Sequence, residues 1–513
     1  MSQFSNSPLA VVGMACQMPS ADGLEAYWDL LKSGRCTQGE IPPERFNRRL
    51  YYNPNKGILC KSYTSIACLM DYKRIDPQRC PLTQEDIDTS DLAHLTICDV
   101  AAEACRHAGY DPFQMPIREN VGVYVGHVKA SELGGEVCFA NQIEQVAEYL
   151  RDIEQIDQIT GGKTSAVIDD IVAGVRGARA QQLARRNLNL SPHRGAALIS
   201  KMLKLDGPNM VVNAACASSL QALAMAGRAL QLGQIDMAVV GGASYCKFDS
   251  LVLFSRAQSV SATGTRPFDA DADGLVNGEG YVTLLVKTLD RALTDGDHIH
   301  ALIRGIGIST DGHGKSLWAP RKEGQIEAIR RAYGTDIDVS RLQFIEAHAT
   351  STQVGDQTEL QSLAETLDGK LPAGTRIPIG SVKGNVGHTI ETAGMAGLLK
   401  TILSMKHGII PPAPNLRQLN PKIDWDNSPF FVPTQPIEWA QHPDGHARRA
   451  AVNSFGIGGL NVHVVLDDFQ PESKTSANVP RTISQTCEPI AIIGMGSVLP
   501  GARTIDAFRD LLS

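Results

Sequence analysis

Several features that would define a class of protein are missing from this sequence. None of its 11 cysteines has the Cys-x-x-Cys spacing of zinc or redox sites. Its longest apolar runs, such as residues 9–16, are far too short to span a bilayer. Residues 1–8 are polar and lack the basic segment and apolar core of a signal peptide. We therefore expect free thiols in a cytoplasmic protein without a membrane span.

Basic charge is scarce as well. The chain has 48 lysines and arginines against 55 acidic residues, which gives a formal net charge of −7. Proteins that bind nucleic acid usually carry a basic face, so we expect no nucleic-acid partner. The hydrophobic fraction of 43% is typical of a globular protein, and 513 residues allow two or three average domains or one large α/β unit.

The start of the chain is repeated near its end. Residues 8–31 and 489–512 align at an offset of 481 residues with ten identities, and both read as a strand, a loop with proline and a helix. Two interpretations are open, namely convergence of two similar units or the start of a second homologous domain. The second is favoured and predicts a first domain over 1–470, a polar linker over 471–487 and the start of a second domain over 488–513.

Strands and helices alternate through the first domain, which predicts an α/β fold with layered sheets. Residues 139–186 differ because they are charged and helical by pattern, and are broken at two glycines. They are either an added helical excursion on the surface or at a subunit contact, or a mobile charged loop. The predicted strands are residues 9–12, 121–125, 209–214, 237–241, 281–286, 342–347, 377–382, 450–454 and 462–466.

One cysteine lies at the junction of a predicted strand and a predicted helix. Cys216 belongs to the sequence Asn-Ala-Ala-Cys-Ala-Ser-Ser-Leu at residues 213–220. A thiol at a helix N-terminus meets free backbone N–H groups and the positive end of the helix dipole, which favours the nucleophilic thiolate. Taken alone, such a cysteine is more often a small buried hydrophobe, so the interpretation needs partner residues.

Two histidine motifs supply candidate partners. Glu-Ala-His-Ala-Thr-Ser-Thr at residues 346–352 closes one predicted strand, and Ser-Val-Lys-Gly-Asn-Val-Gly-His-Thr at residues 381–389 closes another and opens a helix. Functional groups gather beyond the carboxyl ends of strands in α/β sheets, so Cys216, His348 and His388 could converge. Papain-like chemistry is disfavoured, because it explains neither the second histidine nor the glycines around it.

Together these motifs resemble those of the β-ketoacyl synthases, and in particular the ketosynthase domains of iterative polyketide and polyunsaturated-fatty-acid synthases. The family's D-T/A-A-C-S/A-S-S-L, E-A-H-G-T-G-T and V-K-S-N-x-G-H-x-x-x-A-A-G motifs match residues 213–220, 346–352 and 382–394, and two further signatures match residues 266–280 and 453–461. The resemblance runs from about residue 9 to about residue 467. The departures, which bear on the shape of the acyl channel, are Asn213 for the usual aspartate, Ala349 and Ser351 for glycines, and Thr392 for an alanine.

The resemblance implies a fold and a reaction. The fold is the thiolase-like α/β fold, with two pseudo-symmetric β/α halves, roughly 9–262 and 263–467, in a five-layered α/β/α/β/α arrangement, usually as a homodimer. Cys216 would take an acyl chain from a carrier thioester, and His348 and His388 would bind a malonyl thioester and stabilise the enolate formed on decarboxylation. Attack of that enolate on the acyl group would give a β-ketoacyl product.

Other residues are assigned supporting roles by the same resemblance. The backbone N–H groups of Cys216 and Phe455 would form the oxyanion hole. Lys383, with Asp356 and Glu359 as its acidic partners, would support the histidines electrostatically or form a structural ion pair. No metal or redox cofactor is implied, because the substrates are carried on the phosphopantetheine of an acyl carrier protein.

Two alternatives remain on the same scaffold. A chain-length-factor-like partner domain, which shapes the pocket of a condensing enzyme without catalysing, would lack the nucleophilic cysteine. A thiolase would need a second cysteine acting as a base, and none lies between Cys246 and Cys487. The second domain itself could be a ketosynthase or a chain-length factor.

Overall fold

The computed structural model describes residues 7–128, 131–178, 180, 189–314, 316, 318–442, 444–470 and 489–513. The chain divides into two compact units, Met1–Ser473 and Lys474–Ser513. The predicted linker at 471–487 lies outside the described residues. Among the helices that are described, each is too short or too polar to cross a lipid bilayer.

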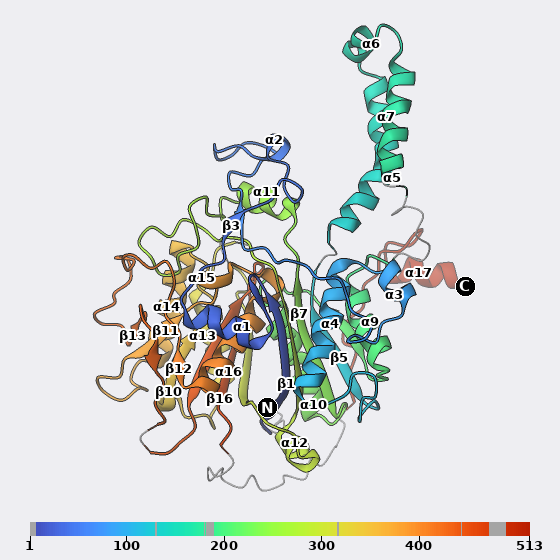
Figure 1. Ribbon diagram of the computed structural model, residues 1–513. Helices are drawn as coiled ribbons and strands as arrows, with labels where there is room; N and C mark the ends of the chain where they lie inside the picture. Colours follow the sequence, from blue (N-terminus) through green and yellow to red (C-terminus); the bar gives the residue numbers. More distant parts are fainter. Residues whose placement is uncertain are drawn as a thin grey trace. The chain divides into compact units, whose positions relative to one another are not determined.

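The first unit is built on a 12-stranded sheet (Figure 1). Two small two-stranded sheets accompany it, β3 (Gly39–Glu40) with β4 (Ile66–Ala67) and β12 (Ile409–Ile410) with β14 (Ile437–Glu438). The strands of the large sheet are β1 (Leu9–Met18), β2 (Ala21–Asp22), β5 (Val121–Gly126), β6 (Asn209–Val212), β7 (Met237–Ser244), β8 (Gly280–Thr288), β9 (Ala301–Thr310), β10 (Leu342–Glu346), β11 (Ile377–Gly380), β13 (Phe430–Phe431), β15 (Arg449–Phe455) and β16 (Leu460–Asp467).

The large sheet consists of two halves with the same strand order. The first half runs β6-β5-β7-β8-β1 and the second runs β11-β10-β15-β16-β9, so each places its strands in the order 3-2-4-5-1 along the chain. The halves join where the start of β1 pairs with the start of β9. This repetition confirms the predicted two-half fold. It assigns β8 to the first half, so a boundary between β8 and β9 fits the topology better than the predicted division at 262/263.

Helices cover both faces of each half. The central helices α10 (Ser218–Gln231) and α16 (Ala393–His407) share one apolar cluster with strands of both halves. Helices α4 (Leu92–His107) and α9 (His193–Leu203) pack on the first half, and α13 (Lys322–Tyr333) and α14 (Gln353–Leu367) pack on the second. The remaining helices of the core are α1 (Leu24–Lys32), α2 (Arg48–Tyr51), α3 (Gln84–Thr89), α11 (Phe248–Arg256), α12 (Leu289–Asp295), α15 (Lys383–Val386) and the 3-10 turns η1 (Val339–Arg341) and η2 (Ile390–Thr392).

Strand β9 was not predicted, although all the predicted strands within residues 9–466 are present with modest changes of length. Its sequence contains Gly305 and Gly307, and glycine inside a strand lowers its β-propensity. The structure shows why glycine is needed there. A Cβ atom at these two positions would lie 2.0 Å and 1.9 Å from carbonyl oxygens of α13, so the glycines allow α13 to pack directly on the strand.

Residues 131–178 form the predicted helical excursion, a hairpin of α5 (Glu132–Arg151), α6 (Glu154–Thr160) and α7 (Thr164–Ala178) (Figure 1). The hairpin has its own small apolar core, and two ion pairs join α5 to α7. Residues 181–186 lie outside the described residues. The core residues are Ile143, Ala147, Ile168 and Val172, and the ion pairs are Arg151–Asp169 and Arg176–Glu144, at 2.6 Å and 2.7 Å.

The described part of the second unit, residues 489–513, contains helix α17 (Ile505–Leu512) but not the strand predicted for residues 490–493. Ile490 and Ile493 are almost fully exposed, at 97% and 99%. Their counterpart β1 is held by pairing with β8 and β9, and residues 489–513 hold no strand that could replace these partners. A second homologous domain therefore stays a prediction.

Candidate functional site

Cys216 lies in the short turn between the end of β6 at Val212 and the start of α10 at Ser218. The residue before it, Ala215, has φ +49°, a left-handed conformation that is costly for a residue with a side chain. Hydrogen bonds hold this turn. Ser218 Oγ accepts the Ala214 N–H at 2.8 Å, and Ser454 Oγ donates to the carbonyl of Cys216 at 2.7 Å. The turn therefore fixes the direction in which the thiol projects.

The replacement of aspartate by Asn213 has a structural explanation. The Asn213 Oδ1 atom accepts the backbone N–H of the strained Ala215 at 3.2 Å. An amide oxygen can accept this hydrogen bond as a carboxylate oxygen can, so the turn keeps its acceptor.

The structure brings Cys216, His348 and His388 together, although they are far apart in sequence. His388 Nε2 lies 3.1 Å from the Cys216 sulfur, and the two imidazole rings meet edge to face with centroids 5.5 Å apart. One sulfur and two nitrogen atoms of the three side chains all lie within 4.8 Å of one another. His348 follows β10, and His388 lies between α15 and η2.

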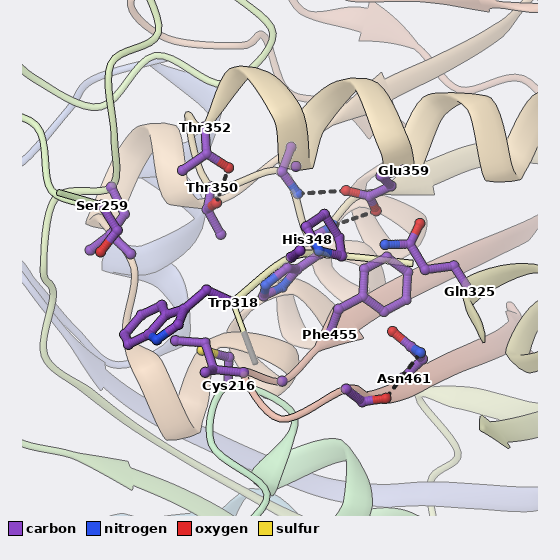
Figure 2. Close-up of a pocket in the computed structure, with 18 of the residues that line it drawn as sticks. Cys216, Ser259, Trp318, Gln325, His348, Thr350, Thr352, Glu359, Phe455 and Asn461 are labelled. Carbon is purple, nitrogen blue, oxygen red and sulfur yellow. Dashed lines mark hydrogen bonds between the residues drawn. The ribbon is translucent and has the colours of Figure 1, made fainter. Parts of the chain in front are cut away.

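The three side chains open into a cavity of about 150 Å³ (Figure 2). Thr350 and Thr352, from the first histidine motif, lie along it. Sequence reasoning missed several lining residues, namely Asp311, Trp318, Gln325, Ile457 and Asn461. Of these, Ile457 and Asn461 lie inside a signature that was recognised, whereas nothing in the sequence singles out Trp318, which lies on a loop between β9 and α13.

Cys216 is a thiol at neutral pH. Burial raises its pKa to about 12, and the nearby Glu391 acts in the same direction. The backbone N–H groups of Ile457 and Cys216 lower the pKa but do not overcome burial. The sequence-based expectation of a resting thiolate is therefore wrong. The desolvation of the sulfur outweighs the backbone N–H groups and the positive charge of Lys383, which both lower the pKa of the thiol.

This protonation state predicts how Cys216 reacts with an alkylating agent. The thiolate is the reacting form, so carbamidomethylation of Cys216 by iodoacetamide should accelerate about tenfold per pH unit from pH 7 to pH 10 without levelling off. Peptide mass spectrometry after timed quenching measures the rate. A plateau below pH 9 would contradict the prediction, and so would a rate independent of pH, which would indicate a thiolate already held by a metal ion.

Both histidines are neutral. Burial lowers the pKa of His348 and of His388 well below the ordinary value, and the positive charge of Lys383 lowers both further. The helix that the second histidine motif was expected to open begins as the 3-10 turn η2 at Ile390 and continues as α16 from Ala393. The two imidazoles are therefore available as uncharged hydrogen-bond donors for reasons of burial and charge.

Lys383, Asp356 and Glu359 lie next to the histidines, but the predicted ion pairs of Lys383 with the two acidic residues are not formed. Neither Asp356 nor Glu359 forms a direct ion pair with Lys383, although all three are described and buried. Burial lowers the pKa of Lys383, while the negative charges of Glu346 and Glu359 oppose this effect. Glu346 instead pairs directly with Lys400 at 2.7 Å.

Asp356 and Glu359 accept hydrogen bonds from backbone N–H groups. Asp356 accepts the N–H of Phe268 at 2.9 Å, and burial raises its pKa to about 7. Glu359 accepts the N–H groups of His348 and Ala349 at 2.7 Å and 2.8 Å, so it fixes the main chain that carries one catalytic candidate.

Two of the other departures from the family motifs, Ser351 and Thr392, are held by hydrogen bonds. Ser351 has φ +65°, a conformation that a glycine adopts easily. Its hydroxyl accepts the N–H of Arg266 at 2.6 Å, which helps to offset the strain. Thr392 is fully buried and donates to the carbonyl of Gly280 at 2.9 Å. These substitutions leave Cys216, His348 and His388 in place.

The loop after β15 contributes two groups to the site. The Phe455 ring lies 5.6 Å from the His348 ring. The backbone N–H of Ile457 hydrogen-bonds with the Cys216 sulfur. A Cβ atom at Gly456 would lie 2.4 Å from the carbonyl oxygen of Ala214, so glycine lets the loop approach the cysteine turn closely. Ile457 is thus a donor at the sulfur that sequence reasoning, which named Phe455, missed.

Comparisons with known proteins agree with this geometry. The β-ketoacyl synthase N-terminal domain matches residues 6–292, its C-terminal domain matches residues 300–417, and the ketoacyl-synthetase C-terminal extension matches residues 420–491. The hybrid PKS-NRPS synthetase traA of Penicillium crustosum is 34% identical over 91% of this chain and 11% of its own length. The highly reducing polyketide synthase Preu1 of Preussia isomera is 32% identical over 91% of this chain and 18% of its own length.

Solved structures give the same result. The ketosynthase from module 6 of the bacillaene synthase of Bacillus subtilis is 30% identical with a TM-score of 0.75, over 91% of this chain and 73% of that one. The oxazolomycin ketosynthase domain OzmH KS7 of Streptomyces albus is 27% identical with a TM-score of 0.76, over 92% of this chain and 76% of that one. The chain spans less than a quarter of the length of the curated relatives it matches.

Proposed function

This chain belongs to the β-ketoacyl synthase family, and on that premise we propose that Cys216, His348 and His388 carry out a decarboxylative Claisen condensation. The observation that supports these roles best is the approach of two neutral imidazoles to one buried thiol at the wall of a cavity.

In the first half-reaction, Cys216 takes the acyl group from a carrier thioester. His388 Nε2, 3.1 Å from the sulfur, accepts the thiol proton as the new carbon–sulfur bond forms. This assistance is needed because burial raises the pKa of the thiol to about 12. The carrier thiolate leaves and takes up the proton.

In the second half-reaction, a malonyl thioester enters and loses carbon dioxide. The resulting enolate oxygen accepts hydrogen bonds from the imidazole N–H of His348 and from that of His388 in the tautomer that carries its proton on Nε2. The enolate carbon attacks the acyl-Cys216 thioester. The oxyanion that forms accepts hydrogen bonds from the backbone N–H groups of Cys216 and Phe455. The Ile457 N–H is a further donor beside the sulfur. One such donor contributes roughly 10²- to 10³-fold in rate. The Cys216 sulfur then leaves as a thiolate and takes up a proton from water, which restores the thiol. The β-ketoacyl product departs.

The substrates and partners belong to the same proposal. An acyl carrier protein would deliver both thioesters on phosphopantetheine, and the reaction would need no metal or redox cofactor. Relatives named as polyketide synthases favour a role in polyketide biosynthesis. Polyunsaturated-fatty-acid-like biosynthesis and a place in the cytoplasm are proposed by analogy with the family. A homodimer is proposed by analogy with the family. The chain-length-factor alternative is not favoured, because its defining loss of the cysteine has not occurred here.

The proposal is tested by following one turnover. The protein is first incubated with an acyl-N-acetylcysteamine thioester and then with malonyl-carrier protein. We expect an intact-mass increase equal to the acyl group, followed by its loss with one equivalent each of carbon dioxide and β-ketoacyl-carrier protein. Release of carbon dioxide without a new carbon–carbon bond would contradict the proposal and favour a decarboxylase.

A further inference from the structure

A chain of buried hydrogen bonds lies behind the cavity and ends at the backbone of His348. His463 Nδ1 contacts Asn453 Oδ1 at 2.5 Å, and Asn453 Nδ2 donates to Glu359 Oε1 at 2.7 Å. Glu359 in turn accepts the N–H groups of His348 and Ala349. Asn453 and His463 are both at most 2% exposed, and neither lines the cavity.

The hydrogen bonds that lead from His463 through Asn453 to Glu359 all run in one direction. Burial lowers the pKa of His463 to about 3, so its ring is neutral and carries a single N–H. Asn453 donates its amide N–H to Glu359, which leaves its oxygen as the acceptor toward His463. His463 Nδ1 must then carry the proton and donate. Each donor therefore fixes the orientation of the next group, and an amide flip of Asn453 would turn two acceptor oxygens toward each other.

These hydrogen bonds also join the two segments that enclose the substrate position. Asn453 and His463 are direct cross-strand partners on β15 and β16. Glu359 is on α14, and it holds the segment that follows β10. Asn453 stands two residues before Phe455, whose ring lies against His348. The bond between Asn453 and Glu359 thus ties the His348 segment to β15 just beyond the last pair of the β10–β15 ladder, Glu346 with Val452.

We propose that Asn453 and His463 are positioning residues of the condensation step, and this inference rests on the function proposed above. They act through Glu359 to hold the His348 imidazole where it can donate to the enolate oxygen. Misplacement of a catalytic group by about 1 Å can cost about 100-fold in rate, so the loss of this support should be visible in turnover. Acylation of Cys216 should not depend on it, because neither residue touches the cysteine.

The test uses Asn453→Asp, which preserves shape but replaces the N–H donor by a carboxyl group. At pH 8 the new carboxylate faces Glu359, and we expect condensation to fall at least tenfold while acylation stays within about threefold of wild type. Two carboxyl groups this close share a proton at lower pH, and the O–H of one can then donate to the other. Condensation by the variant should therefore recover at pH 6 relative to wild type. The other titratable groups facing position 453 and its partners are His463, Lys383, Tyr333 and Asp356. Asp356, whose pKa burial raises to about 7, titrates in the wild type as well, so the comparison with wild type at each pH removes its contribution.

The control is Asn420→Asp, which makes the same change at a buried asparagine outside the chain of bonds. Equal losses of acylation and condensation in the Asn453 variant, or the absence of recovery at pH 6, would overturn the inference and indicate a structural role. If that variant does not fold, His463→Gln, which keeps a donor, must retain more condensation than His463→Leu. Failure of the wild-type protein to condense at any pH would instead overturn the proposed function.

Discussion

Replacement of Cys216 by alanine is expected to abolish covalent acyl transfer and to lower condensation by at least about 10⁴-fold. Among the described residues that line the cavity, Cys216 is the only thiol, and the strained turn at Ala215 holds it beside His388. Intact-mass measurement after incubation with an acyl thioester checks the first effect, and release of β-ketoacyl product checks the second. Acylation of the alanine variant at the wild-type level would remove Cys216 from the mechanism.

A matched control separates chemistry from packing. Cys105 is also fully buried, but it belongs to the apolar cluster under the first half of the sheet. Cys105→Ala makes the same chemical change, the loss of one buried sulfur atom, at a position away from the cavity. It should leave both half-reactions within about threefold of wild type. A comparable loss of activity in the Cys105 variant would show that removal of any buried sulfur damages the fold.

The sequence predicted the fold well where the hydrophobic pattern is local. Strands such as β5 and β7 are short apolar runs, and a buried strand in a layered sheet needs little else. Strand β9 was missed because Gly305 and Gly307 serve contacts with α13, which a strand pattern does not encode. The segment at 490–493 has the composition of a strand but lacks a pairing partner among the described residues, so composition alone was not sufficient.

The candidate site was predictable in its residues but not in its electrostatics. Their place after strand ends made Cys216, His348 and His388 candidates, and the resemblance to the β-ketoacyl synthase motifs assigned their roles. The protonation state of Cys216 depends on how completely the surrounding segments bury the sulfur, and the sequence carries no measure of that. The role of Glu359 as an acceptor of backbone N–H groups is also a property of the folded chain, since its partners are eleven and ten residues away.

Replacement of His348 by alanine is expected to separate the two half-reactions. Alanine keeps the backbone N–H that Glu359 accepts, so the segment after β10 should stay in place. The sulfur of Cys216 keeps its contact with His388, so acylation should remain within about threefold of wild type. The enolate loses one hydrogen-bond donor, and condensation should fall by roughly 10²- to 10³-fold.

His388→Ala supplies the contrast. This change removes the atom 3.1 Å from the sulfur that accepts the thiol proton, and it also removes the second enolate donor. Both acylation and condensation should therefore decrease, with intact-mass and product assays run on the same samples. Equal effects of the two alanine variants on acylation would mean that the Cys216 thiol is activated without His388. Burial and the charge of Lys383 make both histidines neutral, so their charge does not distinguish them. Any difference between their roles would then have to come from how each one contacts the enolate.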